Sequence, residues 1–197
     1  GTICGKNEAI NKFKLILQRE FIDNNIEFKY SYADRQAFRR FKVKNKDEIV
    51  TMGIEQIDPN KEVGKYISPS EWNDFIRDPD TLVIDTRNEY ETRVGLFENA
   101  VDLQLDTFRD FPNAIEQLPE EYKNKQIVMY CTGGIRCEKA SAVMLKAGFC
   151  DVRQLRGGVL DYFKETDGKY WNGDCFVFDE RVALDTDLNE TEYIYCY

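Results

Sequence analysis

The chain has 197 residues, is 42% hydrophobic and 13% aromatic, and carries a formal net charge of −9. This composition can fill a core, so it excludes a disordered protein, and the length suits one large domain or two small ones. The chain has no histidine, which excludes a Ser-His-Asp triad, a Cys-His protease pair and histidine-ligated zinc or iron.

The first part of the chain has the pattern of a small α+β unit. Apolar residues recur every three or four positions in residues 7–22, which predicts an amphipathic helix. Residues 26–32 then alternate apolar and polar side chains, and Phe41 and Val43 alternate with basic residues. We therefore expect two paired strands after the helix.

The next part alternates short apolar strands with helical segments. Ser68-Pro69-Ser70-Glu71 combines a capping box with proline at the first helical position, so a helix begins there. Strands are expected at residues 81–85, 126–130 and 152–155, and a helix at residues 136–147. This alternation predicts an α/β fold with a mainly parallel sheet flanked by helices.

These patterns divide the chain into four parts. The chain starts without methionine, and we expect a trimmed chain whose N-terminal unit lacks its first strand. The expected parts are an α+β domain at 1–52, a linker at 53–66, the α/β domain at 67–166 and a C-terminal extension at 167–197.

The candidate nucleophile is Cys131, which follows one predicted strand and precedes a predicted helix. The active-site loop continues through Thr132, Gly133, Gly134, Ile135 and Arg136. A glycine-containing loop that enters a helix gathers backbone amides around one point, and the helix N-terminus adds about half a positive charge. Together with a nearby arginine, these groups favour the thiolate. The alternative is a strand-end cysteine followed by an ordinary turn.

The other cysteines give weaker signals. Cys137 is either an accessory thiol, which resolves a disulfide or relays sulfur, or a packed helix residue. Cys4, Cys150 and Cys175 are expected to be buried single thiols. No two cysteines have the Cys-x-x-Cys spacing, and we expect no complete metal site.

Charge is segregated along the chain. Residues 29–46 carry seven basic side chains and one acidic one, a net charge of +6, whereas residues 167–197 have a net charge of −6. The basic segment, with its interleaved aromatics, could grip a phosphate backbone and stack bases. Its candidate contacts are Arg35, Arg39, Arg40, Lys42 and Lys44. The alternative is a solvated strand surface whose aromatics face inward.

Motifs on both sides of the Cys131 loop resemble those of the rhodanese superfamily. They are VIDTRNEYE at residues 83–91 and LRGG at residues 155–158. Four residues separate Cys131 from Arg136, as in sulfur-handling rhodaneses, whereas the related dual-specificity phosphatases use five. The resemblance implies that Cys131 is catalytic and can carry a persulfide. We expect Asp85 and Arg87 to fix the strand-to-loop geometry through hydrogen bonds.

A closer resemblance, over nearly the whole chain, is to the tRNA uridine hydroxylase family. It rests on GTICG at residues 1–5, YCTGGIRCEK at residues 130–139 and WNGDCFVFDERV at residues 171–182. It implies a rhodanese-like domain preceded by an acylphosphatase- or ferredoxin-like domain. It also implies a cytoplasmic oxidoreductase that modifies tRNA, converting the wobble uridine to 5-hydroxyuridine with molecular oxygen as co-substrate.

Other functions stay open from the residues alone. A sulfurtransferase would pass sulfane sulfur through a Cys131 persulfide and would need a sulfur donor or thiol partner. A non-catalytic binding module would have an unreactive thiol, and a phosphatase is disfavoured by the short loop. No run approaches the roughly 20 apolar residues of a membrane span, so we expect no membrane partner. The sequence does not predict the oligomeric state.

Overall fold

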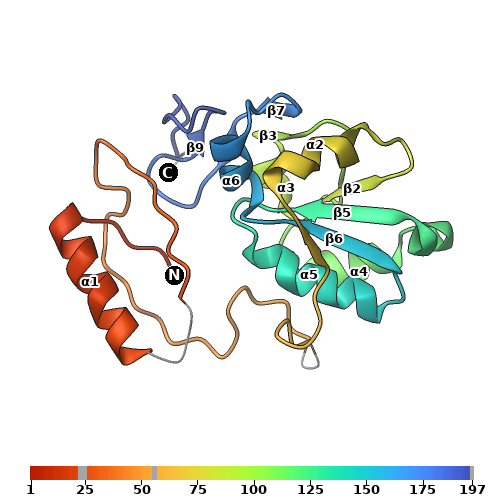
Figure 1. The fold of residues 1–197 in the computed structure, drawn as a ribbon, viewed down its shortest axis with the longest axis horizontal. Coiled ribbons are helices and arrows are strands. Elements are labelled where there is room, and N and C mark those ends of the chain that lie inside the picture. Colours follow the sequence, from red (N-terminus) through yellow and green to blue (C-terminus); the bar gives the residue numbers. More distant parts are fainter. Residues whose placement is uncertain (22–25, 55–56, 196–197) are drawn as a thin grey trace.

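The computed structural model describes residues 1–21, 26–54 and 57–195, and its centre is a five-stranded sheet (Figure 1). The strand order is β1-β6-β5-β2-β4, and every pairing between these strands is parallel. The strands are β1 (Lys65–Ile67), β2 (Leu82–Asp85), β4 (Ala100–Asp102), β5 (Gln126–Tyr130) and β6 (Asp151–Leu155). The predicted parallel sheet is confirmed.

Helices cover both faces of this sheet (Figure 1). One face carries α2 (Pro69–Arg77) and α6 (Gly158–Glu165), and the other carries α4 (Phe111–Glu116) and α5 (Ile135–Lys146). The connections contain the short helices α3 (Glu89–Thr92), η1 (Phe108–Asp110) and η2 (Glu120–Asn124). Because side chains alternate along a strand, β5 contributes to two separate cores, with Met129 beside α5 and Tyr130 on the opposite face.

The core under α2 is built from aromatic rings. The predicted capping box starts this helix, since the Glu71 carboxylate accepts a 3.0 Å hydrogen bond from the Ser68 amide. Trp72 is fully buried, with its ring centroid 5.3 Å from that of Phe97. The Phe97 ring also meets Trp171 at 4.9 Å. The Phe97–Trp171 contact is edge-to-face, a geometry that favours one arrangement of the core.

Trp171 brings the C-terminal extension onto the domain. It belongs to β7 (Trp171–Gly173), which pairs antiparallel with β3 (Gly95–Phe97). A second small ladder joins β8 (Cys175–Phe176) to β9 (Ala183–Leu184). The extension therefore continues the fold, and its described residues lie beside the N-terminal part of the chain (Figure 1).

The N-terminal part differs from the prediction. The expected helix is present as α1 (Asn7–Glu20), although none of its residues is buried, and Ile22 lies outside the described residues. The two strands predicted at residues 26–32 and around Phe41 and Val43 are wrong, because the described residues 26–54 contain no strand. Phe41 and Val43 are 82% and 83% exposed. An extended segment without a neighbouring strand cannot pair its backbone, so alternation alone does not make a sheet.

Residues 48–52, which directly precede the predicted linker, pack on the α/β domain. The Glu48 carboxylate accepts a 2.7 Å hydrogen bond from Lys139 on α5. Met52 is buried in the core beside α5. Strand β1 begins at Lys65, so the stretch predicted as a linker carries the edge strand of the sheet at its end.

Candidate active site

The Cys131 loop lies where β5 ends and α5 begins, at the carboxyl ends of the parallel strands. Gly134 caps α5 with a φ of +90°, a left-handed conformation that favours glycine. In this conformation the Gly134 amide donates a 3.1 Å hydrogen bond to the Cys131 sulfur. Behind the loop, a Cβ at Gly158 would stand 2.4 Å from the Cys131 carbonyl oxygen. The close approach of α6 therefore requires glycine at that position.

The surroundings of Cys131 favour its anionic form. Its exposed fraction is 1%, and this burial raises the pKa of the thiol. A hydrogen bond from the Cys137 thiol, the charge of Arg136 and the amides of Arg136 and Cys137 act in the opposite direction and lower that pKa to about 5. Burial and the neighbouring sulfur hold the pKa of Cys137 well above its usual value. The pair therefore divides into a thiolate at Cys131 and a neutral donor at Cys137.

The charge of Arg136 is shared with a second partner. Its guanidinium donates to both carboxylate oxygens of Glu91, at 2.5 and 2.7 Å, and Glu91 is fully buried. Thr132 donates a 3.3 Å hydrogen bond from its hydroxyl to the same carboxylate. The sequence predicted that the loop amides and Arg136 together favour the thiolate. The structure adds that Arg136 is held in a bidentate ion pair with Glu91, and that the Cys137 thiol also stabilises the sulfur anion.

Glu91 was missed as a site residue. A local signal was present, because Asn88-x-x-Glu91 is a capping box, and the Glu91 side chain accepts a 3.2 Å hydrogen bond from the Asn88 amide. The contact of Lys29 was also missed: its ammonium lies 3.5 Å from the Gly133 carbonyl oxygen, 104 residues away in the chain. No local pattern predicts a contact over that separation.

The thiol of Cys131 is expected to titrate with a midpoint near pH 5. A lowered pKa means that the thiolate is the main form at neutral pH and is protonated only as the pH falls through that midpoint. The measurement is the pH dependence of the ultraviolet thiolate absorbance, taken as the difference between the wild-type protein and Cys131→Ser. Cys137→Ala removes the hydrogen bond to the sulfur and should move the midpoint upward. A wild-type midpoint near the ordinary value of about 8.5 would contradict this assignment.

Asp85 and Arg87 form a buried ion pair beneath the loop. Both side chains have no exposed surface, and the guanidinium donates to Asp85 at 2.6 Å and to the Gly95 carbonyl oxygen at 2.6 Å. The Thr86 amide and hydroxyl both donate to the carbonyl oxygen of Tyr130, the residue before Cys131. The expected role of Asp85 and Arg87 in fixing the strand-to-loop geometry is confirmed.

Three further cysteines lie in the part of the chain that the structure describes. Cys175 is buried, and burial raises its pKa to about 12. Cys4 and Cys150 are exposed, so the expectation of packed thiols is wrong for those two. Cys4 precedes α1 and Cys150 lies in a surface turn before β6, where no core covers them. Among the residues that the structure describes, no group of three or more cysteine, aspartate or glutamate side chains is arranged to hold a metal ion.

The predicted basic contacts fall into two groups. Arg35 pairs with Glu190, and Arg39 donates a 2.7 Å hydrogen bond to Glu180, so both contact the acidic C-terminal extension. The other three lie on an exposed stretch of the same segment: Arg40, Lys42 and Lys44. The opposite charges of the two segments thus meet within one molecule, which composition alone did not predict.

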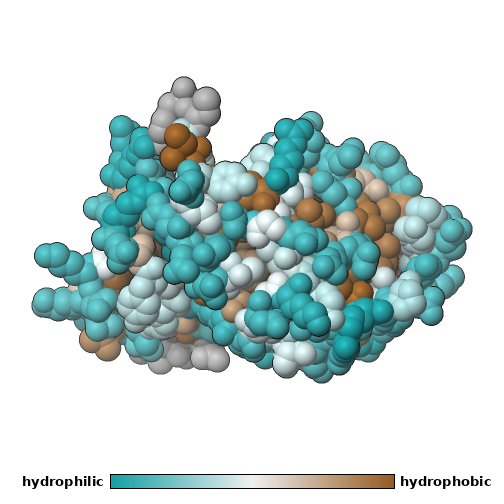
Figure 2. Space-filling view, turned by 90° about the horizontal axis from the view of Figure 1, so that it is seen from above, coloured by the Kyte–Doolittle hydropathy of each residue, from teal (hydrophilic) through white to brown (hydrophobic). Residues whose placement is uncertain are grey.

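No helix in the described part of the chain is both long and apolar enough to cross a bilayer. The face shown in Figure 2 is mostly hydrophilic, with hydrophobic side chains in separate patches.

Comparisons with known proteins match both parts of the chain. Family models identify a UPF0176 acylphosphatase like domain at residues 1–49 and a rhodanese-like domain at residues 68–165. Two curated relatives, from different strains of Prochlorococcus marinus, are 50% and 47% identical over the whole chain and are named tRNA uridine(34) hydroxylase. The chain spans 63% and 64% of the length of these relatives. A rhodanese-like domain protein of known structure from Staphylococcus aureus is 25% identical over 50% of this chain and 90% of its own, with a TM-score of 0.40.

Proposed function

Because the chain is 50% and 47% identical over its whole length to two proteins named tRNA uridine(34) hydroxylase, we propose that it hydroxylates the wobble uridine of tRNA to 5-hydroxyuridine in an oxygen-dependent reaction. Cys131 is the catalytic residue of this proposal, and the loop from Thr132 to Arg136 holds its sulfur. The observation that carries the proposal is the position of the Cys131 sulfur in its loop, where it accepts a 3.1 Å hydrogen bond from the Gly134 amide. The relatives named tRNA uridine(34) hydroxylase match this chain over its whole length. The cytoplasm, where tRNA is found, is the proposed location.

The proposed chemistry is addition of the Cys131 thiolate to the uracil ring. The sulfur electron pair forms a bond to carbon-6, and the π electrons of the carbon-5–carbon-6 bond move toward the carbon-4 carbonyl oxygen as an enolate. Electron density at carbon-5 rises, and this atom forms a bond to molecular oxygen, which gives a carbon-5 hydroperoxide. A two-electron reductant of the thiol class then cleaves the oxygen–oxygen bond, which leaves a hydroxyl on carbon-5 and releases the second oxygen atom as water. Loss of the carbon-5 proton expels the Cys131 thiolate and restores the carbon-5–carbon-6 double bond. Only the thiolate is a strong nucleophile, so a low pKa supports this role. Molecular oxygen is the proposed co-substrate.

Two neighbours of the sulfur have positioning roles in this proposal. Cys137 holds its proton and donates a hydrogen bond, which keeps Cys131 anionic without competing as a nucleophile. Arg136 is fixed by the buried Glu91 carboxylate, so its charge stays in place beside the loop. Preorganised charges of this kind need no rearrangement when substrate arrives.

The basic N-terminal segment is the proposed tRNA contact. Arg40, Lys42 and Lys44 are exposed and can pair with phosphates directly. Arg35 and Arg39 already contact Glu190 and Glu180, so phosphates must compete with these carboxylates. Binding through these side chains is expected to weaken with salt, because each phosphate contact releases counterions.

Nucleoside analysis tests the proposed function. In a strain that lacks the gene for this protein, 5-hydroxyuridine and its derivatives should disappear from the wobble position, because the enzyme that makes them is absent. The measurement is mass spectrometry of nucleosides from purified tRNA, with the wild-type gene restored on a plasmid as the control. Unchanged wobble nucleosides, together with sulfur transfer from thiosulfate by the purified protein, would favour the sulfurtransferase instead.

A further inference from the structure

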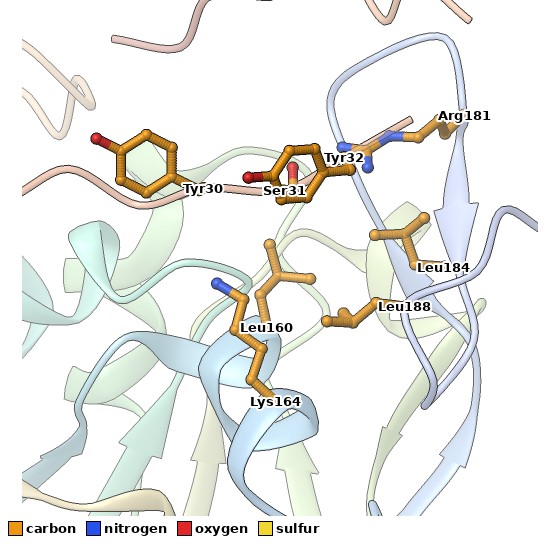
Figure 3. A pocket seen from close by; sticks show the side chains of 8 residues that line it. All are labelled: Tyr30, Ser31, Tyr32, Leu160, Lys164, Arg181, Leu184 and Leu188. Carbon is orange, nitrogen blue, oxygen red and sulfur yellow. The ribbon is translucent and has the colours of Figure 1, made fainter. Parts of the chain in front are cut away.

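A cavity of about 350 Å³ lies between the N-terminal segment, α6 and the C-terminal extension (Figure 3). The residues that matter for its chemistry are Tyr30, Tyr32, Leu160, Lys164, Arg181 and Leu188. We infer that this cavity holds a nucleobase of the tRNA anticodon loop that flanks the wobble uridine. The inference rests on the proposed function and adds to it a second binding site for the same RNA.

The walls of the cavity suit a flat, partly polar ring. Figure 3 shows Tyr30 and Tyr32 along one side, with Leu160 and Leu188 facing them from α6 and from the extension. Tyr32 is 81% exposed, so its ring is available to a ligand. The Tyr30 ring already has the Lys14 ammonium 5.5 Å from its centroid. A base between Tyr32 and the leucines would gain stacking on one face and apolar contact on the other.

The cavity adjoins the loop that carries Cys131. The amide of Leu160, in its wall, donates a 3.1 Å hydrogen bond to the Thr132 carbonyl oxygen. On the opposite side, Tyr30 follows Lys29, whose ammonium lies 3.5 Å from the Gly133 carbonyl oxygen. Both walls are thus tied to the active-site loop. A base in the cavity would be a close neighbour of a uridine at the sulfur.

The charges between cavity and loop suit a nucleic acid. Lys29 and Lys164 each lie 3.0 Å from the Asp161 carboxylate. Two cations share one carboxylate there, which leaves a surplus positive charge for a phosphate of the same nucleotide. The Arg181 guanidinium donates a 2.6 Å hydrogen bond to the Asp179 carboxylate, which fixes the position of Arg181 in the cavity wall. This surplus, beside an aromatic and apolar slot, favours RNA over an uncharged ligand.

The test couples one side chain to one base. Full-length protein binds a labelled anticodon stem-loop RNA at fixed salt, and the dissociation constant is measured by fluorescence anisotropy. Tyr32→Ala should weaken binding about 5- to 150-fold, the effect of losing one base–aromatic stack. Removing the base on the 5′ or on the 3′ side of the wobble uridine, as an abasic nucleotide, should weaken binding similarly at one of these two positions. When Tyr32→Ala binds that abasic RNA, the fold loss in affinity should be smaller than the product of the two separate losses, because both changes remove the same contact.

Phe41→Ala is the matched control. Phe41 is 82% exposed on the same basic segment but does not line the cavity, so its effect on affinity should multiply with that of either abasic nucleotide. Three results would overturn the inference. The fold loss in affinity from Tyr32→Ala could multiply with the loss from the abasic nucleotide at both positions. Alternatively, Tyr32→Ala could leave the affinity unchanged, or the protein could fail to bind the RNA at all. Hydroxylation is measured in the same samples. Binding without product would overturn the proposed function. The cavity would still be tested by whether the Tyr32→Ala and abasic losses multiply.

Discussion

Cys131→Ser is expected to abolish formation of 5-hydroxyuridine, lowering the rate by at least about a thousandfold, the scale seen when an attacking group is removed. Serine fits the loop, but its hydroxyl does not ionise near neutral pH, so the amides and Arg136 have no anion to stabilise. The measurement is the yield of 5-hydroxyuridine in wobble-position tRNA from cells that express the variant as their only copy.

The matched control for this variant is Cys150→Ser, since Cys150 is an exposed thiol outside the loop. It should leave the yield unchanged. Cys131→Ser should still bind the anticodon stem-loop, because the basic segment and the cavity are untouched. A normal content of 5-hydroxyuridine in the Cys131→Ser strain would remove the thiolate from the mechanism.

Asp85→Ala is expected to lower the free energy of unfolding by about 3–5 kcal/mol, because it leaves the Arg87 charge buried without its partner. A domain is typically stable by only about 5–15 kcal/mol, so this is a large part of the total. The Gly95 carbonyl oxygen would remain as an acceptor for the guanidinium, but a carbonyl does not neutralise the charge. Urea denaturation followed by tryptophan fluorescence measures the loss.

Two further variants separate the buried charge from other causes. The double variant Asp85→Ala with Arg87→Met removes both charges and should recover much of the lost stability, since replacing a buried pair with apolar groups is often neutral. Glu120→Ala breaks an ion pair whose glutamate side chain is 85% exposed and should leave the unfolding midpoint nearly unchanged. Equal stability of Asp85→Ala and wild type would show that the pair contributes nothing to the fold.

Much of the α/β domain followed from local patterns. The capping box at Ser68, the apolar strands at β2 and β5 and the start of α5 at the loop are all set by residues close together in the chain. The two predicted N-terminal strands failed because a strand needs a partner. Alternation in residues 26–32 specifies which side chains share a face, but no neighbouring strand in the described residues 26–54 pairs with this segment.

The sequence by itself determined the conformation of the loop that carries Cys131. A strand, a glycine turn and a helix start follow one another directly, so backbone geometry over a few residues places the amides around Cys131. Only the tertiary structure decided what surrounds that loop. Glu91 reaches Arg136 across 45 residues and Lys29 reaches Gly133 across 104. Contacts of this length depend on how the whole chain packs, since burial and charge pairing act between surfaces that no local pattern relates.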